Sequence, residues 1–227
     1  MSTSAVRSIR SPVRGSGQPT NPFSACFAQP GSLDWIDDGT GSIADHWQRF
    51  LALGGRAAII GPHGSGKTTL LTHLSNHARS LGYHSRLVRG ATSEMFSFLA
   101  DHEAAESPHP ALLAIDSAEQ LSRFAFYRIK RRVRHLGIHL VVTAHAPLGL
   151  PVLHRRQPTE ITTRAVLSHL LGAVELSGED LSSLPIRDWL QQPETMRDVI
   201  RIMYDRWEEQ VGERSPADRR QQQETSQ

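Results

Sequence analysis

The sequence predicts an α/β fold in which a mostly parallel, five-stranded sheet lies between two layers of helices. Two observations support this prediction. Short apolar runs of strand length alternate with longer segments whose apolar residues recur at helical spacing, and glycines separate several of these segments. Apolar strands that alternate with helices are typical of a parallel sheet covered on both faces. Right-handed crossovers would bring the loops that follow the strands to one edge of that sheet.

In the first half of the chain, segments with apolar residues at helical spacing alternate with short, continuous apolar runs of strand length. Ile43, Trp47 and Phe50 recur at helical spacing, whereas residues 57–60 form a continuous apolar run of strand length. Glycines follow the first two of the three predicted helices in this region and end them. The expected elements are helix Ser42–Leu53, strand Arg56–Ile60, helix Lys67–Leu81, strand Ser85–Arg89 and helix Glu94–Ala105.

The second half continues the alternation as far as residue 142. An apolar run ends at Asp116, and Gly137 ends the long helical pattern that follows it. Prolines and glycine then break the pattern between residues 147 and 151. The expected elements are strand Ala111–Ile115, helix Ala118–Leu136, strand Ile138–Val142, a fifth strand at Glu160–Thr162, and helices Leu167–Ala173 and Glu194–Gln210.

Composition divides the 227 residues into four parts. Residues 31–175 form the predicted α/β domain, and residues 176–211 form a small helical C-terminal extension. Residues 1–30 are expected to be a disordered arm and residues 212–227 a disordered tail, because both are polar and lack apolar periodicity. The arm is rich in Ser and Arg and has no acidic residue, so an organellar transit peptide stays open as an alternative.

Bulk properties exclude several classes of protein. The single cysteine, Cys26, excludes a disulfide framework and a cysteine-based zinc site. No apolar stretch approaches about 18–20 residues, so we expect no membrane span and a cytoplasmic location. The formal net charge is +2, and only two residues, Lys67 and Lys130, are lysines. A lysine inside a glycine-rich loop is therefore a distinctive feature of this chain.

The most specific motif is the loop between the first strand and the helix that follows it. Its sequence, GPHGSGKT, fits the pattern GxxxxGK[ST] in full, and the flanking strand and helix are the context that the motif requires. Glycines bring backbone N–H groups close to phosphate, and the helix N-terminus favours the same anion. The expected ATP-binding residues are Gly61, Pro62, His63, Gly64, Ser65, Gly66, Lys67, Thr68 and Thr69.

The loop GPHGSGKTTLL and the apolar strand ALLAID resemble the Walker A and Walker B elements of P-loop NTPases. This resemblance implies the three-layer P-loop NTPase fold, with ATP and Mg²⁺ as cofactors. Lys67 would reach the β- and γ-phosphates, and the Thr68 hydroxyl would bind Mg²⁺ with the support of Asp116. The alternative for Asp116 is a helix N-cap, to which Ser117 would contribute. No NKxD-type guanine motif is present, which favours ATP over GTP.

The chain order of Walker A strand, extra strand, Walker B strand and next strand resembles the AAA+ branch. In that branch a polar sensor residue ends the fourth strand, and Thr143 or His145 fits this position. An arginine finger precedes the fifth strand, where Arg155 and Arg156 stand. A finger that acts in trans would require an oligomer. Arg197 is the candidate for a second arginine sensor.

The catalytic base is where the sequence departs from this resemblance. Many such ATPases have a glutamate directly after the Walker B aspartate, but this chain has Ser117. Glu119 is the nearest substitute, and Glu94 is the alternative. The predicted catalytic residues are therefore Lys67, Glu119 and His145, because water activation needs a carboxylate within reach of that water.

A basic face on the predicted helix 118–136 suggests a partner. Its arginines and Lys130 concentrate positive charge on a protein of nearly balanced charge, which suits nucleic-acid phosphates or an acidic protein. The leading functional hypothesis is an Mg²⁺-dependent ATPase or ATP-driven switch that acts on an unknown protein partner. A small-molecule kinase, an ATP-binding module without turnover and a nucleic-acid-associated ATPase stay open.

Overall fold

The computed structural model describes residues 21, 23–24, 35, 37, 39–90, 92–104, 109–157, 159–172 and 195–209. The predicted tail 212–227 and most of the predicted arm 1–30 lie outside these ranges, so the domain boundaries stay predictions. The strands are β1 (Arg56–Ile60), β2 (His84–Arg89), β3 (Ala111–Asp116), β4 (His139–Ala144) and β5 (Val152–Arg155). The helices are α1 (Ile43–Ala52), α2 (Lys67–Ser80), α3 (Ser93–Ala104), the short 3₁₀ helix η1 (Ala118–Gln120), α4 (Arg123–His135), α5 (Glu160–Gly172) and an unlabelled helix at 196–209.

The five strands form one sheet in the order β2-β3-β4-β1-β5, and every neighbouring pair is parallel. This confirms the predicted five-stranded parallel sheet. Because the strands run in one direction, the loops that follow β1, β3 and β4 meet at one edge of the sheet. That edge brings the Walker A loop and Asp116 together, although they are far apart in the chain.

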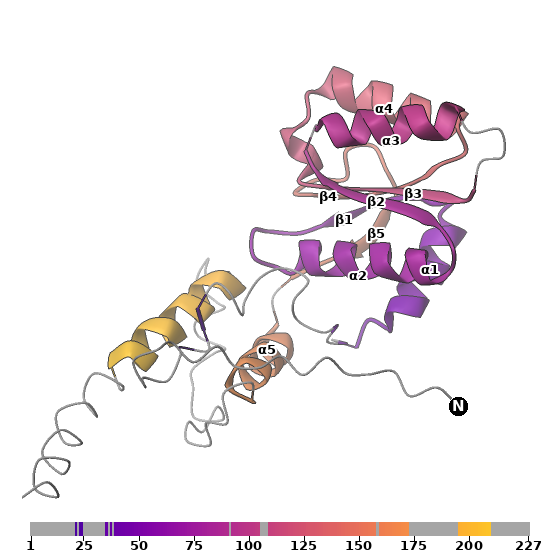
Figure 1. Cartoon of the computed structure of the whole chain (residues 1–227). Helices are drawn as coiled ribbons and strands as arrows, with labels where there is room; N and C mark the ends of the chain where they lie inside the picture. The colour runs from indigo at the N-terminus through magenta and orange to yellow at the C-terminus, as the bar shows by residue number, and fades with distance from the viewer. Residues whose placement is uncertain are drawn as a thin grey trace, which may run out of the picture.

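Helices cover both faces of the sheet, with α3 and α4 on one face and α1 and α2 on the other (Figure 1). Each face has its own apolar core. The six residues of β3 are all buried, which explains why its sequence is continuously apolar and does not alternate. Burial of a large apolar side chain contributes about 1.5–3 kcal/mol, so these two cores hold the loop edge in place.

Local capping agrees with the sequence prediction for α1. Ser42 accepts a hydrogen bond from the Asp45 backbone N–H, and the Asp45 carboxylate accepts one from the Ser42 backbone N–H, which completes a capping box. The apolar stripe of α1 turns Trp47 and Phe50 into the core. This helix packs beside α2, the helix that follows the phosphate loop.

The predicted fifth strand at Glu160–Thr162 is wrong. The fifth strand is β5, which ends before that segment and pairs with β1 as an edge strand. Residues from Glu160 belong instead to α5, which also includes most of the predicted helix Leu167–Ala173. The Thr159 hydroxyl accepts a hydrogen bond from the Thr162 N–H at 3.2 Å, and this N-cap starts a helix in spite of the β-branched residues that follow it.

The predicted helix Ala118–Leu136 is also wrong in its first turns. It is divided into η1 and α4, with the backbone of Leu121 extended between them. Ser122 is the N-cap of α4, because its hydroxyl accepts a hydrogen bond from the Ala125 N–H at 3.1 Å. Helix α4 buries Phe126, Ile129 and Val133 against the sheet.

Residues from both ends of the chain pack together. The side-chain amide of Asn21 donates to the Tyr204 carbonyl and to the Glu208 carboxylate, at 3.1 and 2.9 Å. Phe23 is buried nearby, with 3% of its surface exposed. Among the described residues, no helix is both long and apolar enough to cross a lipid bilayer.

Candidate nucleotide-binding site

The phosphate loop connects β1 to α2, as the motif requires. Gly64 and Gly66 have positive φ values of 68° and 84°, which side chains other than glycine rarely adopt. Lys67 begins α2 and turns back over the loop, where its Nζ donates to the carbonyl oxygens of Gly61 and Pro62 at 2.8 and 2.6 Å. The lysine and the N-terminus of α2 therefore point at the same place, which suits a phosphate group.

Asp116 lies at the end of β3, next to Thr68. The Thr68 hydroxyl donates to both carboxylate oxygens of Asp116, at 3.0 and 3.2 Å. The sequence alternative of a helix N-cap fails, because Ser122 caps α4, and Ser117 makes no side-chain cap. A hydroxyl and a carboxylate are the hard oxygen ligands that Mg²⁺ prefers.

The described residues contain no cluster of three or more His, Cys, Asp or Glu side chains that could hold a metal ion alone. In a nucleotide site, Mg²⁺ needs only one or two protein oxygens, because phosphate oxygens and water complete its coordination. Thr68 and Asp116 are thus suitable residues to hold such an ion.

Thr143 and His145 have different positions, although both are sensor candidates. Thr143 is 1% exposed, and its hydroxyl donates to Asp116 Oδ1 at 2.6 Å while it accepts from the Ser117 N–H at 2.8 Å. It therefore orients the carboxylate from behind. His145 lines the cleft itself, where its ring lies 4.2 Å from the ring of His63, centroid to centroid.

His145 also links the phosphate loop to Glu119. Its Nδ1 lies 3.0 Å from the Gly61 carbonyl oxygen, and its Nε2 lies 3.4 Å from Glu119 Oε1. A carbonyl oxygen only accepts hydrogen bonds, so Nδ1 carries a proton in this contact. The contact with the carboxylate is favourable when Nε2 is protonated too. Glu119 and His145 thus form a polar pair directly beside Lys67 and the loop.

The alternative base, Glu94, lies elsewhere. Its carboxylate is 3.9 Å from the Arg86 guanidinium, and its side chain is 64% exposed on the surface. Glu119, in contrast, lines the cleft together with Lys67 and Asp116. The structure therefore brings Glu119, and not Glu94, to the phosphate loop.

Arg156 is a site residue that the sequence analysis interpreted differently. It is 8% exposed, its Nε donates to the Ser65 carbonyl at 3.2 Å, and its guanidinium lies 5.0 Å from the centre of the Trp35 ring. Its position supports the phosphate loop of its own chain, so it is not presented to a neighbouring subunit. Arg155 is exposed at the end of β5.

Arg89 is a second cleft residue that the sequence did not indicate. It ends β2, and its Nε lies 3.6 Å from Asp116 Oδ2 although most of its side chain is exposed. Burial lowers the pKa of Lys67, and the negative charges of Glu119 and Asp116 oppose this shift in part. Among the described residues that line the cleft, one lysine and four arginines stand beside two acidic side chains, Asp116 and Glu119.

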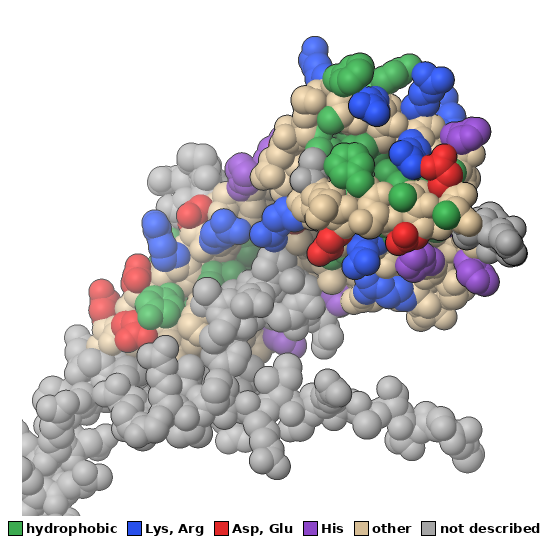
Figure 2. All heavy atoms as spheres, turned by 45° about the horizontal axis from the view of Figure 1, so that its top comes forward, with side chains coloured by type: hydrophobic (Ala, Val, Ile, Leu, Met, Phe, Trp, Pro, Cys, Tyr) green, Lys and Arg blue, Asp and Glu red, His purple; other side chains and the backbone are tan. Residues whose placement is uncertain are grey.

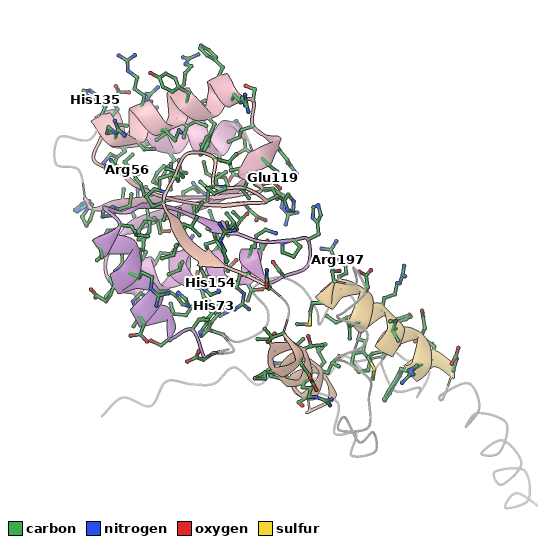
Figure 3. The ribbon with its side chains drawn as sticks, turned by 180° about the vertical axis from the view of Figure 1, so that it is seen from behind. Arg56, His73, Glu119, His135, His154 and Arg197 are labelled. Atoms are coloured by element: carbon green, nitrogen blue, oxygen red, sulfur yellow. The ribbon has the colours of Figure 1, made fainter. Side chains whose placement is uncertain are left out.

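The cleft has a volume of about 890 Å³, within the usual range for sites of small ligands and cofactors. One wall is the phosphate loop with the ends of β2, β3 and β4. The other wall consists of Phe23, Trp35, α5 and helix 196–209. Arg197 and Glu119 both line it and lie on the same side of the molecule (Figure 3). The aromatic and aliphatic residues of the second wall suit a flat ring, and the first wall suits phosphates.

Comparison with known proteins gives a match in structure only. No protein-family model matches the sequence, and no curated protein matches it. The replication initiator DnaA bound to AMPPCP and single-stranded DNA has a TM-score of 0.52, is 15% identical, and is matched over 82% of this chain and 66% of its own. A DNA replication initiation factor has a TM-score of 0.53 and is 16% identical over the same shares.

The chain spans about two thirds of the length of these solved structures. At this low sequence identity the similarity concerns the fold alone. The strand order of the sheet and the phosphate loop of this chain support the same fold without the comparison. The protein has the fold of the P-loop NTPases of AAA+ type.

Proposed function

We propose that this protein binds ATP with Mg²⁺ in the cleft and hydrolyses it, as an ATP-driven switch for a partner. The observation that carries this proposal is the hydrogen bond between the Thr68 hydroxyl and the Asp116 carboxylate. It joins the Walker A helix to the Walker B strand at the position where a nucleotide-bound cation is needed. Such a protein is expected in a compartment that contains ATP, and we infer the cytoplasm.

Each group in the cleft has a role in this proposal. The loop N–H groups and Lys67 would bind the phosphates, and Thr68 with Asp116 would hold Mg²⁺, which would supply positive charge to offset that of the phosphates. Glu119 is the base that accepts a proton from the attacking water. His145 contacts Glu119 on one side and the phosphate loop on the other, so it is placed to respond to the γ-phosphate.

Two features support ATP as the ligand. The cleft has room for a whole nucleotide, with phosphate-binding groups on one wall and apolar side chains on the other. In addition, a solved structure with this fold contains AMPPCP, an analogue of ATP.

Ser117 favours a second candidate, an ATP-binding module without turnover. It occupies the position of the usual glutamate, and its backbone is left-handed, with φ of 58°. The Ser117 N–H donates a hydrogen bond to the Thr143 hydroxyl, and this bond joins the end of β3 to β4. Under this alternative, ATP alone orders the cleft. A small-molecule kinase keeps the same phosphate site and needs an acceptor in place of water.

The test is phosphate release from ATP with Mg²⁺, measured beside nucleotide binding on the same proteins. Wild type is expected to turn over. Lys67→Ala should lose both binding and turnover, whereas Glu119→Gln should keep binding and lose about 10²–10⁴-fold in turnover. Glu94→Gln is the matched control, because Glu94 lies on the surface. ATP binding without phosphate release would favour the other candidates, and absence of binding would refute the proposal.

A further inference from the structure

The outer surface of α4 carries exposed aromatic side chains among arginines. Phe124 is 71% exposed and Tyr127 is 59% exposed, although both are large apolar groups. Residues three, four and seven positions apart share one side of a helix, so Phe124, Tyr127, Arg128 and Arg131 lie together. We call these four residues the aromatic–arginine face. Figure 2 shows hydrophobic side chains surrounded by Lys and Arg on this side of the molecule.

The charge of this surface is one-sided. Helix α4 contains six Lys and Arg residues and no acidic residue. Arg132 forms an ion pair with Glu103 of α3, and Lys130 donates to the Leu148 carbonyl. Within the part of the chain that the structure describes, no ion pair involves Arg128 or Arg131. The Arg128 guanidinium lies 5.9 Å from the centre of the Phe124 ring, which presents a cation and an aromatic plane side by side.

The neighbouring helix α3 also carries an exposed aromatic residue. Phe96 of α3 is 56% exposed, and α3 lies beside α4 on the same face of the sheet (Figure 1). An exposed apolar patch surrounded by polar residues marks an interaction site. Phosphate contacts alone would need only the arginines, as in non-specific binding of a duplex. Rings between the arginines offer planes on which unpaired bases stack.

We propose that the aromatic–arginine face binds single-stranded nucleic acid, with arginines on the phosphates and Phe124 and Tyr127 stacked on bases. Positive charge without acidic neighbours complements a phosphate backbone, and stacking tolerates any base sequence. The strand is held on its backbone and base planes, so no particular sequence is selected.

Helix α4 connects this surface to the nucleotide cleft. At its N-terminal end it follows η1, which carries Glu119, and Lys130 in its middle contacts Leu148 in the loop after β4, which also carries His145. Movement of α4 would therefore reach both members of the Glu119–His145 pair. This coupling rests on the proposed function, whereas binding of the strand does not.

The experiment measures fluorescence anisotropy of a labelled oligo-dT of about 20 nucleotides, long enough for one site, with the full chain at several salt concentrations. A duplex of the same length is the comparison. Each loss of an aromatic ring in Phe124→Ala or Tyr127→Ala should weaken oligo-dT binding about tenfold. Replacement of Arg128 and Arg131 by Ala should weaken binding and also reduce its salt dependence.

Two exposed residues on the opposite helical layer provide matched controls. Leu81→Ala removes an exposed apolar group and Arg49→Ala an exposed arginine, and both should bind oligo-dT as wild type does. Circular dichroism and the thermal unfolding midpoint, measured on every variant, show that the fold is retained. The proposal is overturned if wild type does not bind oligo-dT at low salt, if the aromatic variants bind it normally, or if duplex binds equally well. None of these results bears on ATP binding, so failure of the proposed function would be seen separately.

Discussion

Substitution of Thr143 by valine tests how Asp116 is held. Valine keeps the shape of threonine and removes only the hydroxyl, which is buried and bonded to both the Asp116 carboxylate and the Ser117 N–H. A hydrogen bond to a charged group contributes about 1.5–3 kcal/mol, and an N–H left without a partner costs about 1–3 kcal/mol. We therefore expect the free energy of unfolding to fall by about 3–5 kcal/mol.

Urea unfolding monitored by circular dichroism measures this change, with Thr72→Val as the matched control. The Thr72 hydroxyl donates to the Thr68 carbonyl within its own helix, so its loss should cost less than about 1 kcal/mol. If Thr143→Val lowers the free energy of unfolding by less than about 1 kcal/mol, the Thr143 hydroxyl does not hold the Asp116 carboxylate in place, and this description of the site is refuted.

Three further predictions concern the cleft. Asp116→Asn should bind ATP equally well with and without Mg²⁺, whereas calorimetry on wild type should show tighter binding with the ion. Burial lowers the pKa of Lys67 below its usual 10.5, and phosphate binds the charged amine. ATP affinity should therefore fall as the pH rises through this lowered pKa, whereas Lys67→Arg should show no such decline at alkaline pH. In Gly61→Ala, the new Cβ would lie 2.2 Å from the Arg156 carbonyl oxygen, so thermal unfolding should show a loss of about 1–3 kcal/mol or more relative to Gly82→Ala, whose Cβ would meet nothing within 4 Å.

The parts of the fold that the sequence predicted correctly are those with strong local patterns. Strand β3 is apolar at nearly every position because both of its faces are covered, and α2 follows a loop whose glycines are required by backbone geometry. The phosphate loop could be identified because the motif, the strand and the helix are contiguous in the chain. Asp116 followed from the end of a buried strand, where an unpaired carboxylate would be costly.

The parts that were missed depend on contacts between distant segments. The sequence predicted Arg156 only as an arginine-finger candidate, because its place beside Ser65 depends on the pairing of β5 with β1. Arg89 reaches Asp116 because β2 and β3 are neighbours, which no local pattern reveals. The error at Glu160–Thr162 arose because β-branched residues favour a strand, whereas the Thr159 cap and the packing of α5 determine the result.

The contact of Asn21 with helix 196–209 has a thermodynamic consequence for the whole chain. One wall of the cleft is formed by segments from opposite ends of the sequence, and the other wall is the phosphate loop in between. A nucleotide that contacts both walls binds only when all three segments are assembled, so its binding free energy adds to their cohesion. At a concentration of 100 times its Kd, that contribution is about 2.7 kcal/mol. A bound nucleotide would thus slow the separation of Asn21 from helix 196–209 as well as that of both from the phosphate loop.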